Sequence, residues 1–247
     1  MPVLFRNDEA LKVQVNDYLD LLVHGGVLFR SGLSLYLQDR PDEFHGRLNE
    51  LSALAQQAGE MQRAMVGRIR EPALIARSRD PLARCLERTD KIVRLMSTTL
   101  LEYAVEQPEP VLEGNALLVE LAESSKLVVD AMASALRAHL TEASDETDRA
   151  NAVRQAREET CALGERYKRM IFRLDLRLSH KNQLRHFADA MESIASAAAE
   201  AADRVIASRG SRSVSFGRWA FGWTSASWLA LTILAVVVGT VVTLTAG

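Results

Sequence analysis

Two pairs of acidic residues have a spacing that brings carboxylates together on an α-helix. Glu87 and Asp90 form one pair, and Asp189 and Glu192 form the other, with two residues between the members of each pair. Side chains three positions apart lie on the same helix face. Two such faces turned toward each other could supply enough oxygen ligands for a hard or borderline cation. The alternative is that these acids are solvated or form salt bridges, and the sequence leaves both interpretations open.

Other patterns that carry chemistry are missing from the sequence. The histidines show no His-Glu-x-x-His spacing, and neither a Gly-x-Ser-x-Gly motif nor a glycine-rich phosphate loop occurs. A di-metal carboxylate enzyme built in a helical bundle would need Glu-x-x-His pairs, and the sequence contains none. We therefore expect that the protein is not an enzyme and has no catalytic or cofactor-binding residues.

The elements that must position the acidic pairs are predicted to be long α-helices. The first 208 residues are rich in good helix formers, and all six prolines fall at or before Pro110. Apolar and small residues recur at alternating steps of three and four, which is typical of the seams of antiparallel coiled-coil bundles. One such seam consists of Leu82, Leu86, Thr89, Val93, Met96, Leu100 and Tyr103. The breaks between the seams predict helices over residues 8–38, 42–70, 79–106, 110–140, 144–177 and 180–208.

The acidic pairs also belong to an internal repeat. The segments 86–92 and 188–194 both read acid-x-x-acid-x-Ile, and the segments 59–65 and 164–170 both read Gly-Glu-x-x-basic-x-Met. The offsets are 102 and 105 positions, so the order is kept and the later copy has a shorter turn between its second and third helices. We predict two related three-helix units, 8–106 and 110–208. The alternative is a chance likeness between helices rich in Ala and Glu.

On these features the sequence resembles the PhoU-like family, in particular the class that accompanies Pit-type inorganic phosphate transporters. The resemblance covers residues 8–208 and rests on the six-helix plan, on the repeat and on the segment Ser78-Arg-Asp-Pro-Leu-Ala-Arg-Cys-Leu-Glu-Arg-Thr-Asp-Lys-Ile92. It implies an all-α fold in which two tandem three-helix units form an antiparallel six-helix bundle. It also implies a regulatory or accessory function in phosphate transport, exerted through protein–protein contacts.

The resemblance further implies that acidic clusters on paired helices can hold iron or zinc. The residues that would serve here are Glu87, Asp90, Asp189 and Glu192. Where the family shows Glu-x-Glu-Ala-Asp on its second helix, this chain has Ala-Gln-Gln-Ala-Gly at residues 55–59, and the fifth helix has Ala-Leu-Gly at 162–164. Because these acids are replaced, we expect no bound cofactor, and the alternative is iron or zinc at the four remaining acids.

The C-terminal residues predict a membrane anchor. No charged residue occurs from Trp219 to Gly247, and the nineteen residues 228–246 contain nothing more polar than threonine. As a helix with about 1.5 Å rise per residue, this run approaches the thickness of a bilayer core. Tryptophans and arginines lie on its N-terminal side, and no basic residue follows. We predict a bundle over 1–208 on the cytoplasmic side, a linker over 209–224 and one transmembrane helix over 225–247.

Charge and composition narrow the choice of partners. The net charge is −2, from 30 basic and 32 acidic residues, so no basic field is available to bind nucleic acid. We expect the membrane as one partner and a phosphate transporter or signalling protein as another. A tethered helical scaffold or adaptor unrelated to phosphate is the alternative, because a bundle does not specify a function. A homo-oligomer stays open, since Ala235 and Gly239 have small-xxx-small spacing in the predicted anchor.

Overall fold

The computed structural model describes residues 2–70, 80–141 and 143–204. Over these residues the chain forms six α-helices and no strand, as the sequence predicted. In chain order they are α1 (Pro2–Leu37), α2 (Pro41–Arg70), α3 (Asp80–Glu106), α4 (Leu112–Leu140), α5 (Glu146–Arg173) and a last helix over residues 178–204, called helix 178–204 below.

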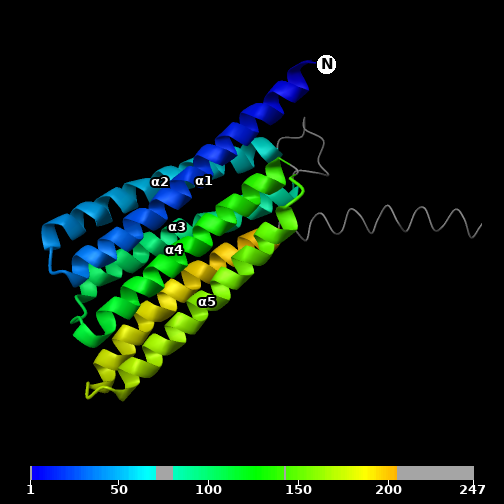
Figure 1. Cartoon of the computed structure of the whole chain (residues 1–247). Helices are drawn as coiled ribbons and strands as arrows, with labels where there is room; N and C mark the ends of the chain where they lie inside the picture. Colours follow the sequence, from blue (N-terminus) through cyan, green and yellow to red (C-terminus); the bar gives the residue numbers. More distant parts are fainter. Residues whose placement is uncertain (1, 71–79, 142, 205–247) are drawn as a thin grey trace, which may run out of the picture. The chain divides into compact units, whose positions relative to one another are not determined.

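The helices pack side by side as one bundle (Figure 1). Helix α1 contacts α2, α3 and α4, whereas α2 packs on α3 and α4 packs on α5. Helix 178–204 contacts α3 through the Cys85 thiol, whose Sγ lies 3.7 Å from the Ala201 carbonyl oxygen. It contacts α4 through the Ser125 hydroxyl, which donates to the Met191 carbonyl at 3.1 Å. The four inner helices are therefore α1, α3, α4 and helix 178–204, with α2 and α5 on the flanks.

The predicted seams form the core of this bundle. In α3, every seam residue from Leu86 to Tyr103 is buried. Aromatic rings close one end of the core, where Tyr103 lies 3.9 Å from Phe187 and 5.0 Å from Tyr36 between ring centroids. Burial of these side chains supplies the main driving force for the bundle. The 3–4 spacing thus identified the buried faces correctly.

The connection between α1 and α2 follows from local backbone chemistry. After α1, Asp39 has a left-handed φ of 55°, and the Arg40 amide donates to the Leu35 carbonyl at 3.1 Å. This is the Schellman pattern that ends many helices. Pro41 then begins α2, because its fixed φ suits a first helical turn and its missing amide hydrogen has no helical partner there.

The predicted fifth helix, 144–177, is too long. Helix α5 ends at Arg173, and Leu174 has an extended backbone with φ −73° and ψ 157°. No proline or glycine near this point marks the end in the sequence. The connection to helix 178–204 consists of residues 174–177, whereas residues 71–79 separate α2 from α3. Residues 71–79 lie outside the described residues, so the shorter turn of the later copy stays a prediction.

All described residues belong to a compact unit that extends over residues 1–206. The predicted linker, 209–224, and the predicted transmembrane helix, 225–247, lie outside the described residues. Among the helices that are described, none combines the length and apolar character needed to cross a bilayer.

Candidate functional site

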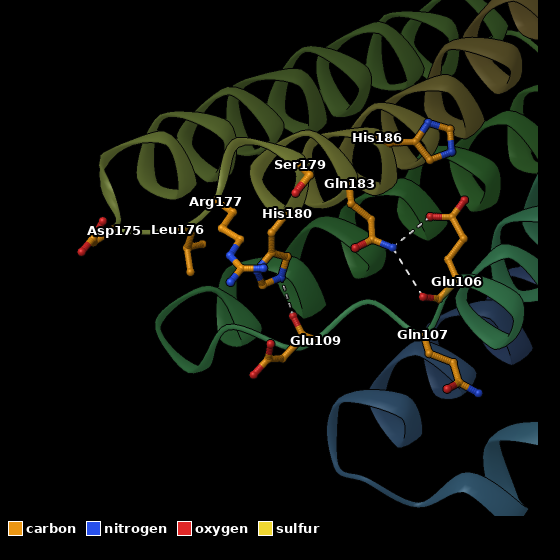
Figure 2. Close-up of a pocket in the computed structure, with 10 residues that line it drawn as sticks. All are labelled: Glu106, Gln107, Glu109, Asp175, Leu176, Arg177, Ser179, His180, Gln183 and His186. Atoms are coloured by element: carbon orange, nitrogen blue, oxygen red, sulfur yellow. Dashed lines mark hydrogen bonds between the residues drawn. The ribbon is translucent and has the colours of Figure 1, made fainter.

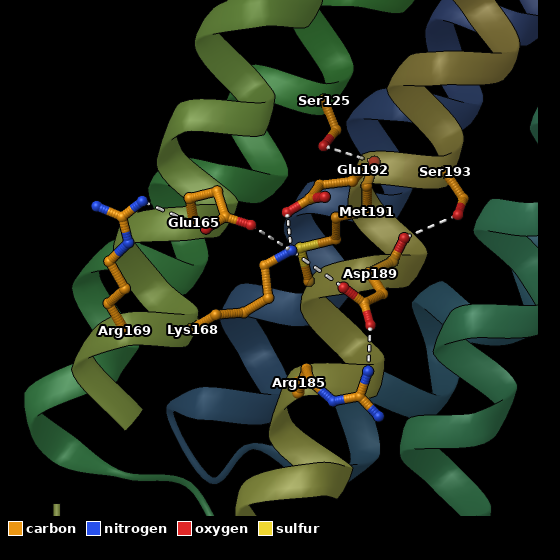
Figure 3. A network of polar contacts seen from close by, with 9 residues as sticks. All are labelled: Ser125, Glu165, Lys168, Arg169, Arg185, Asp189, Met191, Glu192 and Ser193. Atoms are coloured by element: carbon orange, nitrogen blue, oxygen red, sulfur yellow. Dashed lines mark hydrogen bonds and ion pairs between the residues drawn. The ribbon is translucent and has the colours of Figure 1, made fainter. Parts of the chain in front are cut away.

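Lys168 on α5 lies among three carboxylates that come from two helices (Figure 3). Its Nζ is 3.3 Å from Glu165 Oε1 on the same helix. It is 3.2 Å from Asp189 Oδ1 and 2.9 Å from Glu192 Oε1, both on helix 178–204. We call these four residues the Lys168 cluster. The ammonium group therefore joins a flanking helix to an inner helix.

Two arginines extend the Lys168 cluster toward solvent. Arg185 Nη1 lies 3.2 Å from Asp189 Oδ2, and Arg169 Nη2 lies 3.6 Å from Glu165 Oε2. The side chains of Glu165 and Asp189 are 55% and 40% exposed, whereas that of Glu192 is only 20% exposed. Glu192, the least exposed of the three, is therefore the carboxylate whose charge most needs the ion pair with Lys168. The contact is an ion pair by distance, and Glu192 Oε1 receives no directed hydrogen bond from the described residues.

Neighbouring carboxylates keep the Lys168 side chain in its charged form. Burial by itself lowers the pKa of the ammonium group, because a low-dielectric environment disfavours the charged form. The carboxylates of Glu192 and Asp189 outweigh this effect, so the pKa of Lys168 is raised above its ordinary value. Lys168 is therefore cationic at any physiological pH.

Gly164 allows the inner carboxylate to reach α5. A Cβ atom built on Gly164 would overlap the Glu192 carboxylate, including Oε1 and the carboxyl carbon. With glycine at this position, the carboxylate lies directly against the helix backbone, one turn before Lys168. In the second half of the chain, the glycine of the Gly-Glu-x-x-basic-x-Met motif therefore has a steric role.

The first half has a looser version of this arrangement. Gly59 on α2 faces Asp90 on α3, and a Cβ atom built there would lie 3.4 Å from Asp90 Oδ1, which is ordinary contact. Asp90 is 9% exposed, and its Oδ2 lies 2.8 Å from Arg94 Nη2 one turn along the same helix. The basic residue of the motif is Arg63, which is exposed. In both halves, the glycine of the motif thus faces an acidic side chain of a neighbouring helix.

The structure separates the four acids that the sequence singled out. Glu87 is exposed on α3, and Asp90 faces Gly59 of α2, whereas Asp189 and Glu192 both contact Lys168 of α5. Helix α3 and helix 178–204 run antiparallel, because Cys85 contacts Ala201 and Tyr103 contacts Phe187. The two acidic pairs therefore lie at different levels along the bundle.

Among the residues that the structure describes, no group of three or more His, Cys, Asp or Glu side chains has an arrangement suited to a metal ion. Sequence reasoning missed Lys168, although the repeat contains it. The basic position of Gly-Glu-x-x-basic-x-Met was visible as a pattern, but its partners are 21 and 24 residues further along the chain. Only the packing of α5 on helix 178–204 brings them together.

A second polar feature lies at one end of the bundle (Figure 2). A hollow of about 1070 Å³ lies between the connection after α3 and the connection after α5. There His180 Nε2 is 2.9 Å from the Glu109 carbonyl oxygen, and Gln183 donates to Glu106 Oε2 at 3.1 Å. Arg177 and Asp175 also line the hollow. The lining therefore contains three carboxylate residues, one arginine and two histidines.

Comparisons with known proteins support the fold. No protein-family model and no curated protein matches the sequence. Two crystal structures of proteins from Shewanella oneidensis MR-1 are similar over most of the chain. One, described as a candidate PhoU-like phosphate regulatory protein, has a TM-score of 0.70 at 16% identity and covers 79% of this chain and 96% of its own. The other, described as a PhoU-like protein, has a TM-score of 0.72 at 14% identity, with coverages of 78% and 96%. The chain therefore has the fold of PhoU-like proteins, as the resemblance predicted.

Proposed function

We propose that this chain is a membrane-anchored accessory or regulatory protein of inorganic phosphate transport that acts by contacting other proteins. The observation that carries the proposal is the fold, which matches two PhoU-like proteins over 96% of their lengths, one of them described as phosphate-regulatory. The link to a phosphate transporter rests on the sequence resemblance. The membrane anchor rests on the uncharged residues 219–247.

One end of the bundle offers a surface for such contacts. Val105, Leu112, Phe172 and Leu178 are 74%, 83%, 43% and 65% exposed. They lie at the helix ends beside the two connections that surround the hollow, and the hydrogen bonds from His180 and Gln183 hold those connections together. Exposed apolar side chains at one end of a bundle are candidates for contacts with a protein partner. We call this set the connection-end surface.

Partner recovery from membranes tests the proposal. The tagged full-length chain is produced from its own promoter in its native host, extracted in mild detergent and purified, and the bound proteins are identified. We expect a phosphate permease to be recovered with the chain. Recovery should fall when Leu112→Glu and Leu178→Glu are combined, because charges would be placed in the connection-end surface.

Val27→Glu is the matched control, since Val27 is 45% exposed on α1, away from that surface. It should leave permease recovery unchanged. If the full-length chain recovers only partners unconnected with phosphate, the scaffold alternative replaces the proposal. Equal loss in both variants would show that the connection-end surface is not the contact.

A further inference from the structure

We infer that Lys168 is a built-in cation for the acidic cluster of the second half, so that α5 is joined to helix 178–204 without a metal ion. The same side chain closes this cluster to divalent cations. The family resemblance implied that acids at these positions could hold iron or zinc, and the arrangement of the described residues does not fit that expectation.

The ammonium group of Lys168 occupies the place that a metal ion would need. Lys168 Nζ lies within 3.3 Å of carboxylate oxygens from Glu165, Asp189 and Glu192. A divalent ion bound by two or more of these carboxylates would have to sit about 2.0–2.6 Å from the same oxygens. That place and the place of Nζ overlap, so a metal ion and the ammonium group exclude each other.

The charges of the cluster are already balanced. The three carboxylates of the cluster contact three basic groups, since Arg169 pairs with Glu165 and Arg185 pairs with Asp189, in addition to Lys168. The local charge therefore sums to zero before any ion arrives. A dication would bring two uncompensated positive charges into a region where Lys168 and Glu192 are 18% and 20% exposed, which is electrostatically unfavourable.

The α5 side of the cluster has no space for a further ligand at position 164. The Glu192 carboxylate fills the volume that a side chain at position 164 would occupy. Residue 164 therefore supplies no ligand, and the carboxylate that would turn toward an ion is held against the α5 backbone. The neighbouring His186 is directed elsewhere, since its Nε2 lies 3.3 Å from Glu102 Oε2 on α3.

Among the described residues, Asp90 of the first half forms no ion pair with a basic side chain of α2, although Arg63 Nη1 and Asp90 Oδ1 both lie 3.4 Å from a Cβ atom built on Gly59. Asp90 pairs with Arg94 of its own helix, so that ion pair does not join two helices. The role assigned to Lys168 is therefore specific to the second half, and its removal should have a consequence that removal of Arg94 does not have. Without the ammonium group, the three carboxylates would repel one another and become a site for a cation from solution.

Metal content and thermal unfolding of the purified full-length chain test the inference. Wild type, Lys168→Arg and Lys168→Met are equilibrated with Zn²⁺, passed through a desalting column and analysed for bound zinc. We expect wild type and Lys168→Arg to retain no stoichiometric zinc, because a cation remains in the cluster. Lys168→Met should retain about one ion per chain, and added Zn²⁺ should raise its Tm while leaving the Tm of wild type unchanged. Arg94→Met is the matched control and should gain no zinc.

The zinc gained by Lys168→Met should disappear when Glu192→Gln is added to it. A folded Lys168→Met chain without zinc would overturn the inference, as would wild type that holds zinc and loses it on Glu192→Gln. If Lys168→Met does not fold in either condition, Glu192→Gln in the wild-type background decides the matter. It should lower Tm equally in zinc and in chelator, and a larger loss in zinc would contradict the inference.

Discussion

Gly164 lies beside Glu192 of the Lys168 cluster and leaves no room for a side chain at position 164. Because the carboxylate already fills the space beside residue 164, Gly164→Ala must push Glu192 away from Lys168 or separate the two helices. We expect this substitution to lower the free energy of unfolding by about 1–3 kcal/mol, as overpacking typically does.

Gly67→Ala is the control for the propensity of alanine in a helix. Gly67 lies in α2 with no atom within 4 Å of an added Cβ, so alanine there should stabilise by up to about 1 kcal/mol. Urea unfolding of both variants measures the difference. Stabilisation in both would show that the Glu192 contact tolerates a side chain and that the described packing is wrong.

The contribution of Lys168 to the free energy of unfolding depends on pH. The pKa of Lys168 is raised in the folded chain by Glu192 and Asp189 against the effect of burial. Its contribution is therefore fully present below the unfolded pKa of about 10.4 and is lost as pH rises through the folded value. We expect the stability difference between wild type and Lys168→Met to be constant from pH 8 to pH 9.5 and to shrink at higher pH, as measured by urea unfolding.

Comparing wild type with Lys168→Met cancels the pH-dependent contributions of ionisable groups that both chains share. A difference that grows at alkaline pH would mean that Lys168 is easier to deprotonate in the folded chain than in the unfolded chain. That outcome would contradict the ion pairs with Asp189 and Glu192.

At this scale the sequence identified the positions but not their partners. The repeat marked Gly164 and Lys168, and the acid spacing marked Asp189 and Glu192. Their meeting depends on how α5 lies along helix 178–204, and periodicity alone does not fix the relative register of two helices. For the same reason, the sequence left open whether Glu87 and Asp90 meet Asp189 and Glu192.

At the scale of elements, the 3–4 spacing was sufficient to locate the helices and their buried faces, because a seam and a helix face have the same period. Helix ends were less predictable. Pro41 begins α2 for a reason that is visible in the sequence, whereas α5 ends at Arg173 without a proline or glycine nearby. An end of that kind is decided by the packing of the next helix.

The end of α3 provides a test of local backbone strain. Gln107 has a left-handed φ of 44°, and its amide donates to the Tyr103 carbonyl at 3.1 Å. A residue with a Cβ atom in this conformation costs roughly 1–2 kcal/mol, and glycine removes that cost. We expect Gln107→Gly to raise the free energy of unfolding by about 1 kcal/mol.

Gln107→Ala keeps the Cβ atom and is the matched control, so it should change stability less than Gln107→Gly does. Chemical unfolding of the two variants provides the comparison. Equal stability of the glycine and alanine variants would show that the left-handed backbone at Gln107 carries no strain.

At the scale of the whole molecule, the four tyrosines report on the integrity of the bundle. Burial raises the pKa of Tyr36 to about 12 and raises those of Tyr18, Tyr103 and Tyr167 further. Unfolding would return them to about 10, so the unfolded chain binds fewer protons above this pH. The stability of the bundle is therefore present below about pH 10 and falls as pH rises.

We expect tyrosinate absorbance and loss of helical circular dichroism to appear together in an alkaline titration. Tyrosinate that forms near pH 10 while the helical signal stays intact would show that these side chains are accessible in the folded chain.

The overall architecture followed from the sequence because a bundle is specified by many weak, repeated signals that point to the same answer. The six helices, the all-α class and the similarity to PhoU-like proteins are confirmed for the described part of the chain. Function is harder to predict from the sequence, since proteins of one fold can bind many different partners. The predicted anchor at 225–247 and the phosphate connection therefore stay proposals, and they concern the molecule as a whole.

Phosphate uptake by cells tests the central claim most directly. The gene is deleted from its native host, and initial rates of radiolabelled phosphate uptake are measured over a range of external phosphate concentrations. We expect that deletion changes these rates, that the full-length chain restores them, and that a chain ending at residue 208 does not. Rates that are identical with and without the gene at every phosphate concentration would contradict a role in phosphate transport.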